Sequence, residues 1–275
     1  MKERRTLLYV TTTYLLFFAT IGLIGAAMLL LNAPAIVIES LKMVSSWTPT
    51  IALLVLFPRL VPTETRWSYI RRQFSARVGR RTLVMSVVPL TTVLIGTIIT
   101  VSLIGGKSVP ELIIFSPLAV LLMALYCLPF GPVGEELGWR SFLLVHLQQR
   151  HSFTKGTLLT GLVWCFWHTP LWLISGYQGT ELILYTVSFV VAIMCCNFMI
   201  AYMFDACRNL LIPVIIHLLN NLFLQILTFE LVPGLAYFAA SYLAVTAVFV
   251  VIEEPRRRAR QAARADIESG SLAHA

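Results

Sequence analysis

The sequence predicts an all-α fold, a polytopic bundle of about eight transmembrane helices. Of its 275 residues, 58% are hydrophobic and only 12% are charged, and a soluble domain does not bury that much apolar surface. The apolar residues also fall into long runs that recur along the chain, each close to the ~20 residues that a helix needs to cross a bilayer. These two observations favour a membrane bundle over any soluble class.

The apolar segments follow one another from the N-terminus. They lie at about residues 7–31, 43–58, 82–104, 112–131, 157–175, 181–204, 211–229 and 233–252. The second is the least regular, because Pro49 lies inside it and Ser45, Ser46 and Thr48 make its start polar; a bundle can satisfy the backbone group that a proline frees. With no internal repeat and no linker, residues 1–254 are expected to form one domain, with its motif-bearing core at about 45–225.

The basic residues predict how the bundle lies in the membrane. With a cytoplasmic N-terminus, nearly all the loop arginines face the cytoplasm, whereas the opposite side keeps only Lys42 and Lys107 from the basic set, beside acidic residues such as Glu39 and Glu111. The net charge of +8 therefore reflects topology, not nucleic-acid binding. We expect a multi-pass protein of a prokaryotic cell (plasma) membrane, with both termini cytoplasmic.

Two polar segments and the cysteines complete this picture. Residues 66–81 mix arginines with Trp67, Tyr69 and Phe74, which fits either an interfacial amphipathic helix or a solvated basic loop. Residues 255–275 are polar and rich in alanine, and are expected to be a basic, mostly disordered cytoplasmic tail. The five cysteines show no CxxC spacing, so we expect neither a disulfide framework nor a zinc knuckle.

A few polar side chains interrupt the apolar pattern, and they are the candidates for function. They are Glu135, Glu136, Arg140, His168, Asn197, His217, Asn220 and Asn221. A single buried histidine or asparagine is more often a hydrogen-bonding residue between helices than a ligand. The case for function therefore depends on how these residues combine.

The stretch Gly134–Arg140 contains two adjacent carboxylates, and only one of them has a cation at helical spacing. Glu136 and Arg140 are four residues apart on a helix and can form a salt bridge. Glu135 lies about 100° around that helix and has no cation at helical spacing of its own. A carboxylate kept near the membrane without a partner suits a general base or a metal ligand.

The two histidines supply the remaining groups. His168 lies in an apolar run just before Pro170, while His217 and Asn221 are four residues apart and share a helix face. We expect both histidines in the early part of their segments, at the depth of Glu135 in the cytoplasmic half of the membrane. A Glu/His/His set can hold zinc with an open position, or a carboxylate can activate water without metal. Either way, water attacks a carbonyl whose oxyanion Asn221 stabilises. Neither HExxH nor GxSxG occurs.

At these residues the sequence resembles the CPBP family of intramembrane metalloproteases, which includes type II CAAX prenyl endopeptidases and abortive-infection or bacteriocin-immunity proteins. The family pattern is EExxxR, an aromatic residue four before a histidine, and HxxxN, found here at 135–140, 164–168 and 217–221. Trp164 stands where the family often has phenylalanine. The resemblance implies Glu135 as the water-activating carboxylate assisted by His168. It also implies that His217 and Asn221 bind a metal or stabilise the oxyanion, with Glu136 and Arg140 as a supporting pair.

These observations lead to an intramembrane endopeptidase as the predicted function. Its predicted catalytic set is Glu135, Glu136, Arg140, His168, His217 and Asn221, and Glu135, His168 and His217 are candidate ligands for a divalent metal such as zinc. The expected partners are a peptide or membrane-protein substrate and the lipid bilayer, with no nucleic acid. The main alternative is a non-catalytic immunity or assembly factor that binds through the same polar cluster. A transporter ranks last, because no repeat is present.

Overall fold

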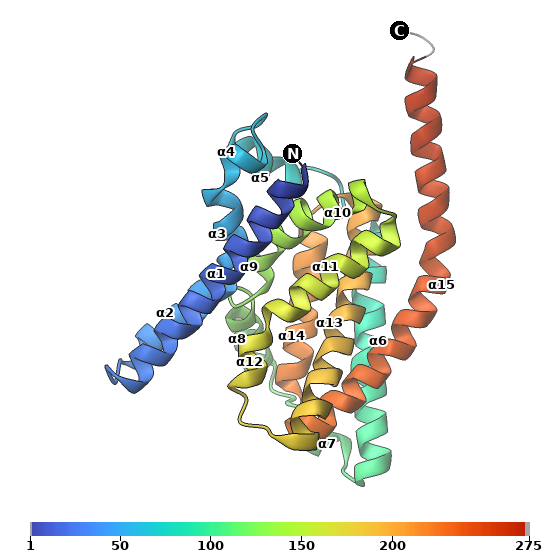
Figure 1. Ribbon diagram of the computed structural model, residues 1–275. Coiled ribbons are helices and arrows are strands. Elements are labelled where there is room, and N and C mark those ends of the chain that lie inside the picture. The colour runs from blue at the N-terminus through green and yellow to red at the C-terminus, as the bar shows by residue number, and fades with distance from the viewer. Residues whose placement is uncertain (1, 273–275) are drawn as a thin grey trace.

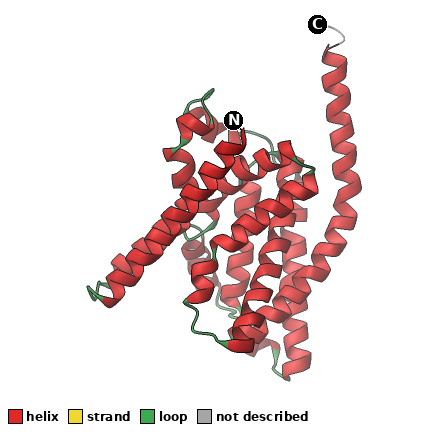
Figure 2. Ribbon diagram, viewed as in Figure 1, coloured by secondary structure: helices red, strands yellow, loops and turns green. Residues whose placement is uncertain are grey.

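The chain folds as an all-α bundle, as predicted. A computed structural model describes residues 2–272, and the regular elements in that range are helices (Figure 1, Figure 2). An isolated antiparallel bridge joins Ile113 to Leu227. Five stretches of the described chain are long and apolar enough to cross a membrane: Arg4–Leu29, Arg80–Gly105, Pro117–Arg150, Gly179–Cys207 and Leu231–Ile267. They support a multi-pass membrane protein.

These stretches correspond to five of the eight predicted segments. They are built by α1 (Lys2–Leu29), α6 (Arg80–Gly105), α13 (Gly179–Cys207), α15 (Leu231–Leu272) and a composite of α8 (Pro117–Cys127), α9 (Pro132–Glu136), η1 (Leu137–Leu144) and α10 (Val145–Arg150). The seventh segment forms the shorter apolar helix α14 (Leu211–Ile226). Shorter still are α5 (Arg66–Gln73) and α7 (Val109–Leu112).

The second and fifth predicted segments are not single helices, which corrects their expected boundaries. The second consists of α2 (Ala35–Ser46), α3 (Thr48–Val55) and α4 (Phe57–Leu60), and the fifth of α11 (Phe153–Trp167) and α12 (Thr169–Leu173). In α3 and α12 a proline occupies the first turn, where its missing N–H removes no helical hydrogen bond. Each proline therefore begins a new helix after a break, one at Trp47 and the other at His168.

The break in the fifth segment changes the position of His168. It was expected in the early part of that segment, yet it caps the C-terminal end of α11. His217 does lie in the second turn of α14, as expected. Because α11 crosses the bundle obliquely (Figure 1), its C-terminal end still reaches the neighbourhood of His217: the ring of Trp164 lies 5.1 Å from that of His217 and 6.2 Å from that of His168.

The segment after Pro255 was expected to be mostly disordered, and that expectation is wrong for residues 255–272, which continue α15. Arginine and alanine, which dominate this stretch, are good helix formers. Glu254 pairs with Arg257 and Arg258, each at 2.7 Å, and these are the helical spacings at which charge pairs add stability. Arg264 also lies 3.3 Å from Asp205 at the end of α13. Residues 273–275 lie outside the described range.

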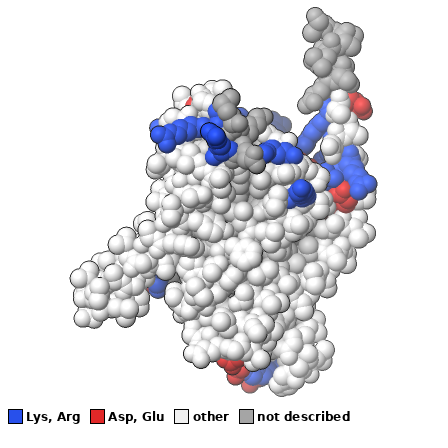
Figure 3. Space-filling model, in the orientation of Figure 1, with Lys and Arg blue, Asp and Glu red and all other residues white. Residues whose placement is uncertain are grey.

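Charged residues separate the two ends of the molecule. In Figure 3 the lysines and arginines gather at the end that carries the N-terminus and the projecting part of α15, while acidic residues with a few basic ones mark the opposite end. The surface between them is almost free of charge in that view. Such a band is typical of the part of a protein that contacts lipid.

The α9 and η1 segment lies in the interior of the bundle, and two glycines allow it to pack there. A Cβ added to Gly134 would lie 2.7 Å from Trp47, and one added to Gly138 would lie 2.6 Å from the backbone of Pro49 and would also meet the hydroxyl of Tyr9. The backbone of α3 therefore approaches this segment closely, as small residues four apart permit in membrane bundles.

Gly138→Ala is expected to destabilise the fold by about 1–3 kcal/mol, because the backbone of Pro49 cannot yield the way a flexible side chain can. The thermal unfolding midpoint of the purified protein in detergent measures this. Gly22→Ala in α1 is the matched control, since a Cβ there meets no atom within 4 Å. Equal midpoints for the two variants would contradict the close approach.

Candidate functional site

Three functional groups from α9 and α14 face one point beside Gly131. A Cβ placed on Gly131 would lie 3.4 Å from Oε1 of Glu135, 3.2 Å from Nε2 of His217 and 3.2 Å from Nδ2 of Asn221. The absence of a side chain at Gly131 keeps this point open. A carboxylate, an imidazole and a carboxamide thus meet beside the backbone of Gly131.

The carboxylate of Glu135 is fixed by two tryptophans. Its Oε2 accepts hydrogen bonds from Nε1 of Trp164 at 2.6 Å and from Nε1 of Trp139 at 3.2 Å. Both bonds go to Oε2, which leaves Oε1 to face Gly131. Trp164 is the residue that replaces the family's frequent phenylalanine, and phenylalanine has no N–H to donate. This substitution therefore adds a donor to the carboxylate.

Glu136 joins two of the other candidates. Its Oε2 accepts from Nε of Arg140 at 2.7 Å, and its Oε1 lies 2.8 Å from Nδ1 of His217. The predicted pair of Glu136 and Arg140 is thus present, and the contact with His217 is additional. When Nδ1–H of His217 donates to this carboxylate, Nε2 presents its lone pair toward Gly131.

Arg140 ties η1 to the neighbouring helices. It is completely buried, its Nη1 donates to Oδ1 of Asn197 at 2.5 Å, and its guanidinium lies 4.4 Å from the centre of the Trp164 ring. Asn197 in turn donates to the backbone carbonyl of Thr157 at 2.8 Å. Asn197 was recognised in the sequence only as a polar residue out of place, because nothing in its spacing linked α13 to Arg140.

His168 lines a cavity together with Glu135. Its Nδ1 is 2.8 Å from the carbonyl oxygen of Trp164, and its ring packs edge-on against those of Trp167 and Phe189. Together with Glu135 it lines a cavity of about 270 Å³ whose other walls are mostly apolar. His217 is thus found beside Gly131, and His168 in the wall of this cavity.

The asparagine pair is arranged differently from expectation. The sequence suggested that Asn220 hydrogen-bonds to a neighbouring helix, but its Nδ2 donates to Oδ1 of Asn221 at 3.2 Å. This bond fixes which end of the Asn221 carboxamide carries the free N–H groups. Those are the groups near Gly131.

The predicted metal ligands do not form a ligand cluster. Within the described residues, no group of three or more His, Cys, Asp or Glu side chains is placed to hold a metal ion. Glu135 and His217 share the point beside Gly131, where the third group is the carboxamide of Asn221, whereas His168 faces the cavity. The divalent metal therefore stays a prediction, and the mechanism below is derived from the side chains of this chain alone.

Comparison with known proteins bears on the same segment. Residues 117–223 match the family described as type II CAAX prenyl endopeptidase Rce1-like, and this stretch holds all six residues of the predicted catalytic set. The match covers less than half of the chain. It supports the resemblance to CPBP proteins that the three motifs predicted.

A curated relative agrees with the Rce1-like assignment. The CAAX prenyl protease 2 of Methanococcus maripaludis is 27% identical over 161 residues, which cover 46% of this chain and 59% of that protein. The chain thus spans less than two thirds of this relative's length. Both comparisons support a protease of the CAAX type at the level of the family.

Arg140→Met is expected to lower the stability of the protein by about 3–5 kcal/mol, because it leaves the buried carboxylate of Glu136 without its cation. Unfolding in detergent, followed by circular dichroism, measures the loss. Arg72→Met breaks the exposed pair with Glu64 and should cost at most about 1 kcal/mol. If the two variants lose equal stability, Glu136 does not depend on Arg140.

Proposed function

We propose that the chain is an intramembrane endopeptidase in which Glu135 activates water for attack on a peptide bond. The observation that carries the proposal is the meeting of Glu135 Oε1, His217 Nε2 and Asn221 Nδ2 around the space beside Gly131. A general base, a second proton acceptor and a hydrogen-bond donor are the groups that hydrolysis of an amide requires. The match of residues 117–223 to the Rce1-like family supports the same reaction class.

Each group has a separate task in the proposed mechanism. Oε1 of Glu135 takes a proton from the water, whose oxygen bonds to the carbonyl carbon, while Nε2 of His217 accepts the other hydrogen of that water in a hydrogen bond and orients it. The carbonyl oxygen becomes an oxyanion that accepts from Nδ2 of Asn221. The protonated Glu135 then gives its proton to the leaving nitrogen as the C–N bond breaks.

The surrounding residues prepare these groups for the reaction. Glu136 holds His217 in the orientation that presents Nε2, as carboxylates do for functional histidines. Trp139 and Trp164 hold Oε2 of Glu135 and so aim Oε1. His168 assists from the cavity side, where it lines the same walls as Glu135.

We further propose a membrane-embedded peptide as the substrate. The names of the matched family and of the archaeal relative refer to CAAX prenyl substrates, in which a lipid-modified cysteine lies near the C-terminus. The mostly apolar cavity beside Glu135 suits apolar side chains better than charged ones. A prenylated peptide is therefore the first probe to use. We also propose that the basic end faces the cytoplasm, since lysine and arginine mark that side in membrane proteins.

Glu135→Gln is expected to slow cleavage by roughly 10²–10⁴-fold, because the amide cannot act as a general base. The assay uses the full chain in detergent with a fluorescence-quenched, farnesylated CAAX peptide and the same peptide without the lipid. Glu111→Gln is the matched control, because Glu111 is exposed and caps α7 at Ser108. Its rate should equal that of the wild type.

Two results would count against this proposal. If Glu135→Gln and His217→Ala cleave as fast as wild type, the mechanism is wrong. If the wild type cleaves neither peptide while Glu135→Gln retains the protein's biological effect in cells, the chain acts as a non-catalytic immunity or assembly factor. If the wild type cleaves only the unmodified peptide, the chain is still an endopeptidase, but its substrate does not carry a prenyl group.

Gly131→Ala is expected to reduce the cleavage rate by at least about 10²-fold, because a methyl group would occupy the place where water meets Glu135, His217 and Asn221. The same peptide assay measures this. Gly25→Ala in α1 serves as the control, since its Cβ meets no atom within 4 Å. A fully active Gly131→Ala enzyme would show that water binds elsewhere.

A further inference from the structure

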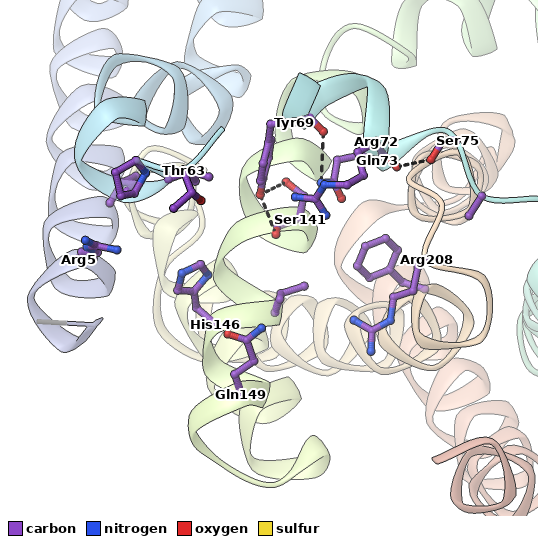
Figure 4. A pocket seen from close by; sticks show the side chains of 16 residues that line it. Arg5, Thr63, Tyr69, Arg72, Gln73, Ser75, Ser141, His146, Gln149 and Arg208 are labelled. Carbon is purple, nitrogen blue, oxygen red and sulfur yellow. Dashed lines mark hydrogen bonds between the residues drawn. The ribbon is translucent and has the colours of Figure 1, made fainter. Parts of the chain in front are cut away.

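A second cavity lies at the basic end of the bundle and shares no residue with the one beside Glu135. It measures about 540 Å³ and is lined by parts of α1, the loop before α5, α5 itself, η1, α10 and α13. Figure 4 shows the side chains of Arg5, Arg72 and Arg208 around it, with those of His146 and Gln149. None of the described lining residues is an aspartate or a glutamate.

A neighbouring cavity makes this absence informative. That cavity, of about 480 Å³, is also lined by arginines, among them Arg257 and Arg264, but Asp205 and Glu254 lie in its walls. Its positive charge is therefore offset by carboxylates that face the same space. The cavity at Arg5, Arg72 and Arg208 has no such groups in its lining, so an anion that enters it meets cations and no carboxylate.

The carboxylates that do pair with these arginines orient them from outside the lining. Nη2 of Arg72 lies 2.7 Å from Oε1 of Glu64, and Nη2 of Arg208 lies 2.6 Å from Oδ1 of Asp205. A guanidinium has five N–H donors, so each arginine keeps donors for a ligand. Arg5 adds a third guanidinium from the start of α1.

The backbone around the cavity is held in place for this arrangement. Arg208 ends α13 in the left-handed conformation, with φ of 53°, where glycine or asparagine is usual. On the other wall, the Tyr69 hydroxyl lies 2.9 Å from the carbonyl oxygen of Ser141. Burial raises the pKa of Tyr69 to about 12, so its hydroxyl stays protonated and can donate this bond.

The cavity lies where a membrane protein meets lipid headgroups. In α5, Tyr69 is buried against η1, whereas the side chain of Trp67 is 73% exposed and that of Phe74, just beyond the helix, is 49% exposed. Exposed aromatic rings among arginines are typical of the bilayer interface. Of the two readings of residues 66–81, the interfacial helix therefore fits residues 66–73.

We propose that this cavity binds the phosphate of an anionic phospholipid headgroup. Three guanidinium groups with free donors match a phosphate, and basic pockets at this level of a membrane protein select charged headgroups. The lipid is favoured over a free phosphate compound because the cavity lies at the basic end, next to the surface that is almost free of charge in Figure 3. This binding is independent of the proposed peptidase reaction.

Binding of a short-chain lipid tests the proposal. The full chain in a zwitterionic detergent at 150 mM salt is titrated with dihexanoyl-phosphatidylglycerol, and the heat of binding is followed by calorimetry. One saturable site is expected. Dihexanoyl-phosphatidylcholine, glycerol phosphate and inorganic phosphate are titrated in parallel, and each should bind at least about tenfold more weakly.

Two double variants distinguish binding in the cavity from general attraction to the positive charge at this end of the molecule. Arg5→Gln with Arg72→Gln should weaken binding of the phosphatidylglycerol by roughly tenfold to a hundredfold. Arg77→Gln with Arg80→Gln removes the same charge from exposed residues outside the lining and should change it less than about threefold. Gln149→Glu places a negative charge in the cavity wall and should also weaken binding. This single variant tests the cavity even if the first double variant does not fold.

Three outcomes would overturn the proposal. Equal weakening by the two double variants would mean attraction to the whole basic end. Equal affinity for phosphatidylcholine would show that the cavity does not select an anionic headgroup. Equal affinity for inorganic phosphate would assign the cavity to a soluble phosphate compound in place of a lipid.

Discussion

The site depends on one buried carboxylate, that of Glu136. It accepts from Arg140 on one oxygen and contacts His217 with the other, so a single side chain fixes the relation of η1 to α14. Placing a carboxylate inside a bundle is costly unless its partners are close and well oriented. Two charged or polar partners satisfy that condition here. Without Glu136, the ring of His217 loses its partner at Nδ1, and Arg140 keeps only Asn197 and the ring of Trp164.

Glycines supply the second constraint. Gly134 and Gly138 let α3 approach the segment that carries both glutamates, and Gly131 leaves the space into which Glu135, His217 and Asn221 point. Trp47, at the break between α2 and α3, donates from Nε1 to the carbonyl oxygen of Pro129 at 2.9 Å. The loop that contains Gly131 is thus held by Trp47 through its neighbour Pro129. Packing and reactivity here depend on the same short stretch.

Much of this could be predicted from the sequence. Long apolar runs gave the all-α class, and helical spacing gave the pairing of Glu136 with Arg140 and the common face of His217 and Asn221. The breaks at Trp47 and His168 could not be placed, because a proline inside an apolar run is compatible with either a kinked helix or a new one. The same limit put His168 at the wrong end of its segment.

The spacing of residues within one helix does not predict contacts between helices. Nothing in the sequence indicates that Glu136 reaches His217 or that Arg140 reaches Asn197, since these pairs are 81 and 57 residues apart. The tail was misjudged for a related reason: its composition suggested disorder, whereas the ion pairs of Glu254 and the contact of Arg264 with Asp205 support a helix. Tertiary contacts decided both cases.

The segment η1 contributes to both the polar cluster around Glu136 and the basic cavity. It is a π-helix, a geometry that is rare and is often found at functional sites. Within it, Arg140 faces the interior and pairs with Glu136, while the next residue, Ser141, lies in the wall of the basic cavity and contacts Tyr69. Adjacent residues on a helix point about 100° apart, so one lies in the buried polar cluster and the other reaches the basic cavity. A displacement of Tyr69 would therefore act on the backbone next to Arg140, and the stability of η1 is a property that both sites share.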